Sequence, residues 1–171
     1  MKFAMWSLFV ALTLAVSGTA SAEVSEMSGT YQLDQEASDD LVEAFEPAVS
    51  EMSRFRRGFA RRAIRRKDGP DEVMKIELND EEIVIHAGDS PAMEIPLNGE
   101  VIEYEDSSGD IQQVSAKVHD EFVEVHTRIN EGEYTAEYRI GDGGQRLEID
   151  MVMDIDRLPK KVDYRIVYRR R

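Results

Sequence analysis

The chain has 171 residues, with 35 acidic and 21 basic side chains, a formal net charge of −14 and no cysteine. This length favours a single domain. The acidic balance argues against a nucleic-acid partner, and the absence of cysteine excludes disulfides, cysteine-ligated zinc, iron–sulfur clusters and thiol catalysis. Hydrophobic residues make up 42% of the chain, which is enough for a folded core.

The first 22 residues have the pattern of a secretory signal peptide. Lys2 supplies a positive charge, residues 3–16 form an apolar run, and Ala20-Ser21-Ala22 match the small-x-small rule of signal peptidase. We expect cleavage before Glu23, which leaves one domain over residues 23–171 as a soluble, exported protein of the periplasm or the extracellular space. The alternative is an uncleaved membrane anchor, although the apolar run is shorter than the ~20 residues of a membrane span.

A helical segment, either one helix or a pair, is expected over residues 38–67. Its apolar residues recur in steps of three and four, which places them on one stripe of a helix: Leu41, Phe45, Ala48, Met52, Phe55, Phe59 and Ala63. Asp40, with Glu43 three residues later, fits the start of a helix. Pro47 is expected to kink the helix or to occupy the first position of a second one. Asp68-Gly69-Pro70 ends the segment.

The rest of the chain alternates apolar and charged residues with a period of two, which is typical of antiparallel strands that bury one face. One strand, at residues 29–33, precedes the helical segment, and about nine follow it. Turn residues separate them, and Asn98-Gly99 has the composition favoured in two-residue hairpins. The clearest alternating runs cover residues 74–78, 83–85, 93–97, 102–104, 123–125, 134–140, 147–155 and 162–168.

Short links favour the pairing of consecutive strands. We therefore expect a mainly β fold with one helical segment. It is either an antiparallel up-and-down β-barrel or a strongly curved sheet, of about ten strands, with the helical segment 38–67 inserted between strands 1 and 2.

Short motifs at both ends of the chain support this fold. The first strand opens with Gly29-Thr30-Tyr31-Gln32-Leu33-Asp34, followed by Ser38. Near the other end come Gly141-Asp142-Gly143-Gly144, Leu158-Pro159 and a closing strand that ends in Arg169-Arg170. In these motifs the chain resembles small secreted bacterial lipocalin-like proteins of the calycin type, a group of largely unknown function, although Tyr31 stands where that group usually has Trp. The resemblance implies a β-barrel with a helical lid and ligand binding, and it implies no catalytic residues.

Residues 54–67 hold eight basic side chains and no acidic one. On a helical wheel, four arginines lie opposite the apolar stripe and are candidates for anion binding: Arg54, Arg57, Arg61 and Arg65. Such a face can bind an anionic lipid surface, an acidic protein or the headgroup of an anionic ligand. The alternative is that these charges pair with the acidic strands and complement the helix dipole.

The apolar face of the expected barrel is rich in methionine and tyrosine, which suit a cavity for an amphipathic ligand. Small barrels can also be packed solid, so a filled core is the alternative. The candidates for cavity contacts are Phe55 and Phe59 of the lid, together with Met74, Met93, Tyr104, Tyr134, Tyr138, Met151, Met153, Tyr164 and Tyr168.

Other chemistry has little support in the sequence. The three histidines lack the spacing of metal ligands, so no metal or cofactor is expected. Residues 106–110 lack the full pattern of a calcium loop. Because no nucleophile motif occurs, no catalytic residue is assigned, and an enzyme is only the third hypothesis.

The first hypothesis is a periplasmic lipocalin-like protein that binds a hydrophobic or amphipathic small molecule, anionic ones included. In it the lid turns Phe55 and Phe59 toward the barrel. The second is a non-enzymatic envelope or protein-interaction module that uses the basic helix 54–67 on an anionic membrane surface or an acidic partner. The sequence does not specify the oligomeric state.

Overall fold

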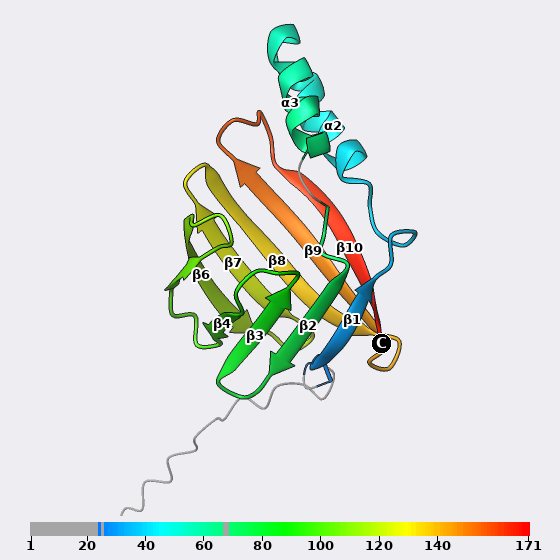
Figure 1. Ribbon diagram of the computed structural model, residues 1–171, viewed down its shortest axis with the longest axis vertical. Coiled ribbons are helices and arrows are strands. Elements are labelled where there is room, and N and C mark those ends of the chain that lie inside the picture. Colours follow the sequence, from blue (N-terminus) through cyan, green and yellow to red (C-terminus); the bar gives the residue numbers. More distant parts are fainter. Residues whose placement is uncertain (1–23, 25, 67–68) are drawn as a thin grey trace, which may run out of the picture.

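The computed structural model describes residues 24, 26–66 and 69–171. The signal peptide expected over residues 1–22 and its cleavage site before Glu23 lie outside the described residues. Ten antiparallel strands form one sheet that curls into a nearly closed barrel, and two helices lie between β1 and β2 (Figure 1). The mainly β fold expected from the sequence is thus confirmed. Neither helix is long and apolar enough to cross a membrane.

The elements follow the predicted order. They are β1 (Gly29–Leu33), α2 (Leu41–Glu51), α3 (Arg54–Arg66), β2 (Val73–Leu78), β3 (Glu82–Ala87), β4 (Met93–Pro96), β5 (Ile102–Glu105), β6 (Ile111–Val118), β7 (Val123–Ile129), β8 (Gly132–Gly141), β9 (Arg146–Ile155) and β10 (Val162–Arg170).

Consecutive strands pair along the sheet, whose order is β4-β3-β2-β1-β10-β9-β8-β7-β6-β5. The first and last strands meet, since Tyr31 on β1 lies opposite Arg170 on β10 and opposite Met74 on β2. The first and last strands of the chain therefore pair with each other within the sheet. The strands β4 and β5 are left as the two edges of the sheet.

The hairpin predicted at Asn98-Gly99 is wrong, because β4 and β5 do not pair with each other across it. Gly99 still has the left-handed φ of +82° that such a turn favours. The segment instead contacts β6, where Asn98 bridges to Lys117 and the Gly99 N–H donates to the Ala116 carbonyl at 3.0 Å. At the seam between the edge strands β4 and β5, a single bridge to β6 thus takes the place of a ladder.

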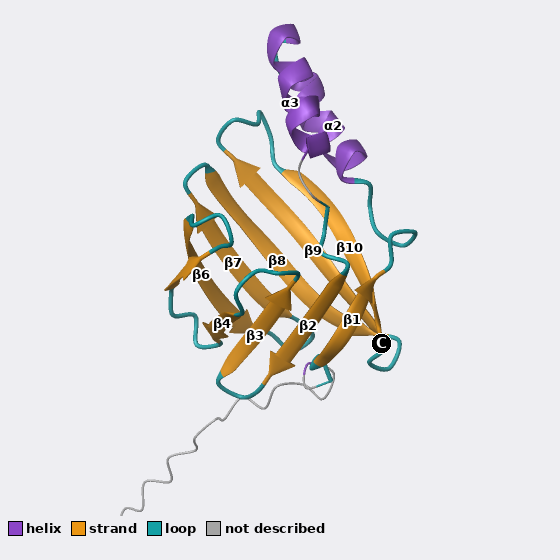
Figure 2. Cartoon of the chain, in the orientation of Figure 1, coloured by secondary structure: helices purple, strands orange, loops and turns teal. Residues whose placement is uncertain are grey.

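The helical segment is a pair of helices. The Asp40 carboxylate accepts from the N–H groups of Val42 and Glu43 at 2.7 and 3.1 Å, so it caps α2 as expected. Pro47 lies inside α2 rather than at the first position of a second helix, and α2 ends at Glu51, three residues before α3 begins. Both helices rise from one end of the barrel (Figure 2).

The opposite end of the barrel is closed by the chain that precedes β1. Val24 and Met27 have no exposed surface, and neither has Tyr31, whose hydroxyl donates to the Met27 carbonyl at 2.7 Å. These side chains pack with inward residues of almost every strand, among them Ile76, Ile83, Ile95, Val114, Val123 and Leu147. The closed half of the barrel is therefore a filled core.

Candidate ligand-binding site

The helical end of the barrel contains a cavity of about 760 Å³, here called the mouth cavity. Helix α2 contributes Leu41 and Phe45, and the strand ends contribute residues such as Met153 and Tyr164. Phe45 packs on Tyr164 with ring centroids 6.4 Å apart, so α2 forms one wall of the mouth. The other lining residues are Met52, Arg56, Phe59, Ala60, Ala63, Ile64, Gly69, Pro70, Ile129, Glu131, Ile155, Arg157 and Leu158.

A second cavity of about 710 Å³, the rim cavity, adjoins the first and shares four of its lining residues, Ile129, Glu131, Met153 and Tyr164. It continues past the turn between β5 and β6 and along β8 and β9. Its other lining residues are Asp106, Asp110, Ile111, Gln112, Asn130, Tyr134 and Met151. Together the two cavities form one hollow at the open half of the barrel.

The candidates for cavity contacts divide between these two halves. Phe59, Tyr134, Met151, Met153 and Tyr164 line the hollow. Apart from Phe55, the others are packed in the main core, where Met74, Tyr138 and Tyr168 are buried and Met93 and Tyr104 are partly buried. Both alternatives left open by the sequence, a cavity and a filled core, therefore occur in the same barrel. The role of these residues in ligand contact stays a prediction.

Phe55 does not face the barrel, which corrects the placement expected from the sequence. Its side chain is 89% exposed, and Phe59 is 78% exposed although it borders the mouth cavity. The expected stripe assumed a helical phase that continued through residues 52 and 53, where the structure has a break between α2 and α3. The side of α3 that lines the cavity consists of Arg56, Phe59, Ala60, Ala63 and Ile64.

The four arginines predicted to bind anions have different environments. Arg61 pairs with Glu46 on α2, with 2.9 Å between Nε and Oε2, and Arg57 donates from Nε to the Met52 carbonyl at 2.8 Å. Arg54 and Arg65 are exposed. Among the described ion pairs, α3 contributes the one with Glu46 and none with the strands. The alternative, in which these charges pair with the acidic strands, is not seen among the described ion pairs, where Arg61 pairs with the neighbouring helix instead.

The tyrosines of the barrel are neutral hydrogen-bonding groups. Burial raises the pKa of Tyr164 to about 12, and it also raises the pKa values of Tyr134, Tyr138 and Tyr168. The Tyr134 hydroxyl donates to the Gln112 side-chain carbonyl at 3.3 Å. Polar ligand atoms at this wall would therefore meet uncharged donors and acceptors.

Sequence reasoning missed several residues of the hollow. Gln112 lines the rim cavity from the inward phase of β6, next to the buried Thr127 on β7, and this polar interruption of an apolar face was a usable signal. Arg157 lies in a turn that carried no such signal. Within the described part of the chain, no group of three or more His, Asp or Glu side chains is placed to hold a metal ion.

No family model matches the sequence, and no curated protein matches it. Solved structures do match its fold. A secretory abundant heat soluble protein from Ramazzottius varieornatus has a TM-score of 0.58 at 12% identity, over 85% of this chain and 96% of that one. Fatty-acid-binding protein 1 of Echinococcus granulosus has a TM-score of 0.56 at 11% identity, over 85% and 97%. A structure described as the REP1-NXSQ fatty acid transporter has a TM-score of 0.51 at 14% identity, over 85% and 96%.

The chain has the calycin-type β-barrel fold. The resemblance noted in its terminal motifs is confirmed at the level of the fold, because each of these matches covers 85% of the chain. At these identities the likeness concerns the calycin fold, and the function has to be argued from the hollow itself.

Proposed function

We propose that this calycin-type protein binds a hydrophobic or amphipathic small molecule in the hollow under α2 and α3. The observation that supports this proposal most directly is the pair of adjoining cavities, of about 760 and 710 Å³, at the open half of an otherwise filled barrel. Both volumes are typical of small-molecule sites, and the lining of the mouth cavity is mainly apolar. Solved proteins of the same fold are described as a fatty acid transporter and a fatty-acid-binding protein, which supports the proposal.

The energetics favour a ligand with a long apolar portion. Each methylene buried against Met153, Tyr164 and their neighbours contributes about 0.8 kcal/mol. Association itself costs at least ~4 kcal/mol in lost translational and rotational freedom. A short or strongly polar molecule gains too little free energy of burial in this hollow to offset that cost, whereas an acyl or polyprenyl chain gains enough.

The test is to fill the hollow and to measure the binding of a fluorescent fatty-acyl probe. Met153 points inward and is 8% exposed, whereas its neighbour Val152 is 40% exposed on the outer face. Met153→Trp should weaken probe binding about tenfold or more, and Val152→Trp should leave it unchanged. Native mass spectrometry of the purified protein should also show a lipid-like adduct. A clean mass with no probe uptake by the unmodified protein would contradict the proposal.

We further propose that the protein is exported to the periplasm after cleavage before Glu23. The sequence of residues 1–22 supports this, and so does the burial of Val24 and Met27, because cleavage at that bond leaves the closing segment of the barrel intact. The test is N-terminal sequencing of the mature protein. It should begin at Glu23, and Ala22→Asp should block processing. A mature chain that retains Met1 would contradict the proposal.

A second candidate function is docking on an anionic lipid surface, and the exposure of Phe55 and Phe59 favours it. Two large aromatic side chains next to free arginines are the composition of an interfacial helix. Binding to phosphatidylglycerol vesicles should fall on Phe55→Ala/Phe59→Ala and on Arg54→Ala/Arg65→Ala. Arg128→Ala, which removes an exposed charge from β7, is the matched control. Equal binding by all variants, or equal binding to phosphatidylcholine vesicles, would rule this out.

A further inference from the structure

The inner wall of the barrel is almost free of charge. The registers of the ten described strands place one set of residues inward, from Tyr31 on β1 to Tyr168 on β10. No acidic residue belongs to this set, and its one cation is Arg170. Arg170 lies at the closed end, where it contacts Tyr31 and donates to the Gly144 carbonyl at 2.6 Å. It is therefore remote from the open half and already has partners.

This wall accepts neutral polar groups and rejects anions. The inward polar side chains near the hollow are Gln112, Thr127, Tyr134 and Tyr164, all uncharged. A carboxylate or phosphate placed among them would lose its hydration without gaining a cation, which costs several kcal/mol. An anionic headgroup must therefore stay at the mouth.

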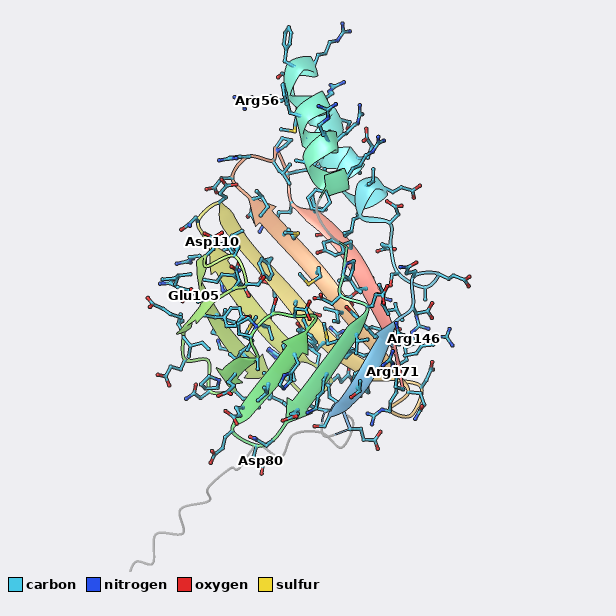
Figure 3. The ribbon with its side chains drawn as sticks, viewed as in Figure 1. Arg56, Asp80, Glu105, Asp110, Arg146 and Arg171 are labelled. Carbon is cyan, nitrogen blue, oxygen red and sulfur yellow. The ribbon has the colours of Figure 1, made fainter. Side chains whose placement is uncertain are left out.

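The mouth offers cations on one side only. Arg56 on α3 and Arg157 in the turn between β9 and β10 line the mouth cavity, and Arg157 already pairs with Glu131 at 2.5 Å. Arg56 has no ion pair among the described residues, and its side chain is exposed. On the other side of the hollow, Asp106 and Asp110 line the rim cavity. Figure 3 shows Arg56 on the helix above the open end and Asp110 at the rim of the barrel.

We infer that the ligand is a single-chain amphiphile with an anionic head, which enters tail first and keeps its head at Arg56 on the helix side of the mouth. This inference rests on the proposed function, since it assigns the head and tail of a ligand in the same hollow. A guanidinium binds carboxylate or phosphate oxygens through two parallel hydrogen bonds, which gives the head a fixed place. The exposed arginines around it on α3 add to the positive potential, whereas the carboxylates of Asp106 and Asp110 repel the head from the opposite rim.

The first experiment compares oleate with oleyl alcohol, which have the same chain and differ in headgroup charge. Arg56→Ala should weaken oleate binding about five- to tenfold and leave oleyl alcohol within about twofold. Arg62→Ala is the matched control, because it removes an exposed arginine from the same helix that does not line the cavity. It should change neither affinity by more than about twofold. An equal loss for both ligands, or no loss for oleate, overturns the inference.

The second experiment tests the direction of entry. A 16-carbon diacid places a carboxylate inside the barrel whichever end enters first, whereas the 16-carbon ω-hydroxy acid can place its neutral hydroxyl there. The diacid should bind about tenfold or more weakly than the hydroxy acid. Equal affinities overturn the inference while the proposed function stands. If oleyl alcohol and oleate both fail to bind the unmodified protein, the proposed function fails and the inference fails with it.

Discussion

Arg170 lies over the ring of Tyr31, with its guanidinium carbon 5.3 Å from the ring centroid and one terminal nitrogen 3.0 Å from the phenol oxygen. The same guanidinium donates to the carbonyl oxygens of Gly144 and Glu26. It therefore joins four parts of the chain at the closed end: the N-terminal segment, β1, the turn between β8 and β9, and the last strand. The cation–π part of this contact depends on the aromatic ring of Tyr31.

Arg170→Ala should lower the free energy of unfolding by about 2–4 kcal/mol, since it removes charge-assisted hydrogen bonds and a cation–π contact together. Arg170→Lys keeps the charge but loses the planar set of N–H donors of the guanidinium, so it should lower the free energy of unfolding by an intermediate amount. Urea denaturation is the measurement. Arg171→Ala, at an exposed neighbouring position, should cost about 0.5 kcal/mol or less. Equal effects of the alanine variants would show that the stack contributes nothing.

Met27→Ala tests whether the segment before β1 belongs to the core. Met27 is fully buried and packs in the main cluster, so its truncation should lower the free energy of unfolding by roughly 2–5 kcal/mol. Glu26→Ala next to it removes an exposed side chain and should have an effect within about 0.5 kcal/mol. A Met27 variant as stable as the Glu26 variant would mean that this end of the barrel closes without the segment.

The contact between α2 and α3 should depend on pH. The hydrogen bond from Arg61 holds the pKa of Glu46 below its usual value of 4.5, and the charges of Arg57 and Arg65 act in the same direction. A depressed folded-state pKa means that the stabilisation is fully present above the unfolded value and is lost as the pH falls through the folded value. The protection factors of the α3 amides, which are corrected for the intrinsic pH dependence of exchange, should therefore fall as the pH drops well below 4.5.

Glu46→Gln should remove this dependence, because the amide cannot titrate. Glu43→Gln on the exposed side of α2 should retain it. The comparison separates loss of one contact from general acid unfolding, which would affect both variants alike. A wild-type and Glu46 variant with parallel exchange profiles would contradict the assigned contact.

Stability at high pH should fall in a defined window. Tyr164 ionises at 10.0 in the unfolded chain, whereas burial raises its folded-state pKa to about 12. The folded state therefore binds more protons between these values, and its stabilisation is lost as the pH rises from 10 to 12. Tyr164→Phe should reduce this loss, as measured by thermal unfolding across the window.

Below pH 10 the tyrosine is neutral, so binding of oleyl alcohol should not change between neutral pH and that value. A binding transition near neutrality would point to another group.

Much of the fold was predictable because alternation is a local property. Residues 147–155 show it over a whole strand, and β9 is found there. The failure at Asn98-Gly99 has a different origin. Turn chemistry reports the local backbone, which Gly99 does adopt, but it does not report which strands are close enough to pair. The curvature of the barrel decides that, and curvature is a property of the whole sheet.

The candidate site was less predictable for a similar reason. Periodicity shows which helical residues share a face, as Phe59 and Ala63 do, but it fails across a break in the helix. Once the chain leaves helical geometry at Met52 and Ser53, the direction of Phe55 depends on how α3 packs against α2. The placement of Arg56 rather than Arg61 at the cavity follows from the same packing, which no local sequence pattern indicates.

The seam between β4 and β5 gives the barrel wall a line of weakness. Every other neighbouring pair of strands is joined by a ladder, so widening the barrel elsewhere would break several hydrogen bonds at once. At the seam, the contacts to be broken are the isolated bridge between Asn98 and Lys117 and the hydrogen bond from the Tyr104 hydroxyl to the Pro91 carbonyl. A change in the circumference of the barrel therefore breaks the fewest backbone hydrogen bonds at this seam.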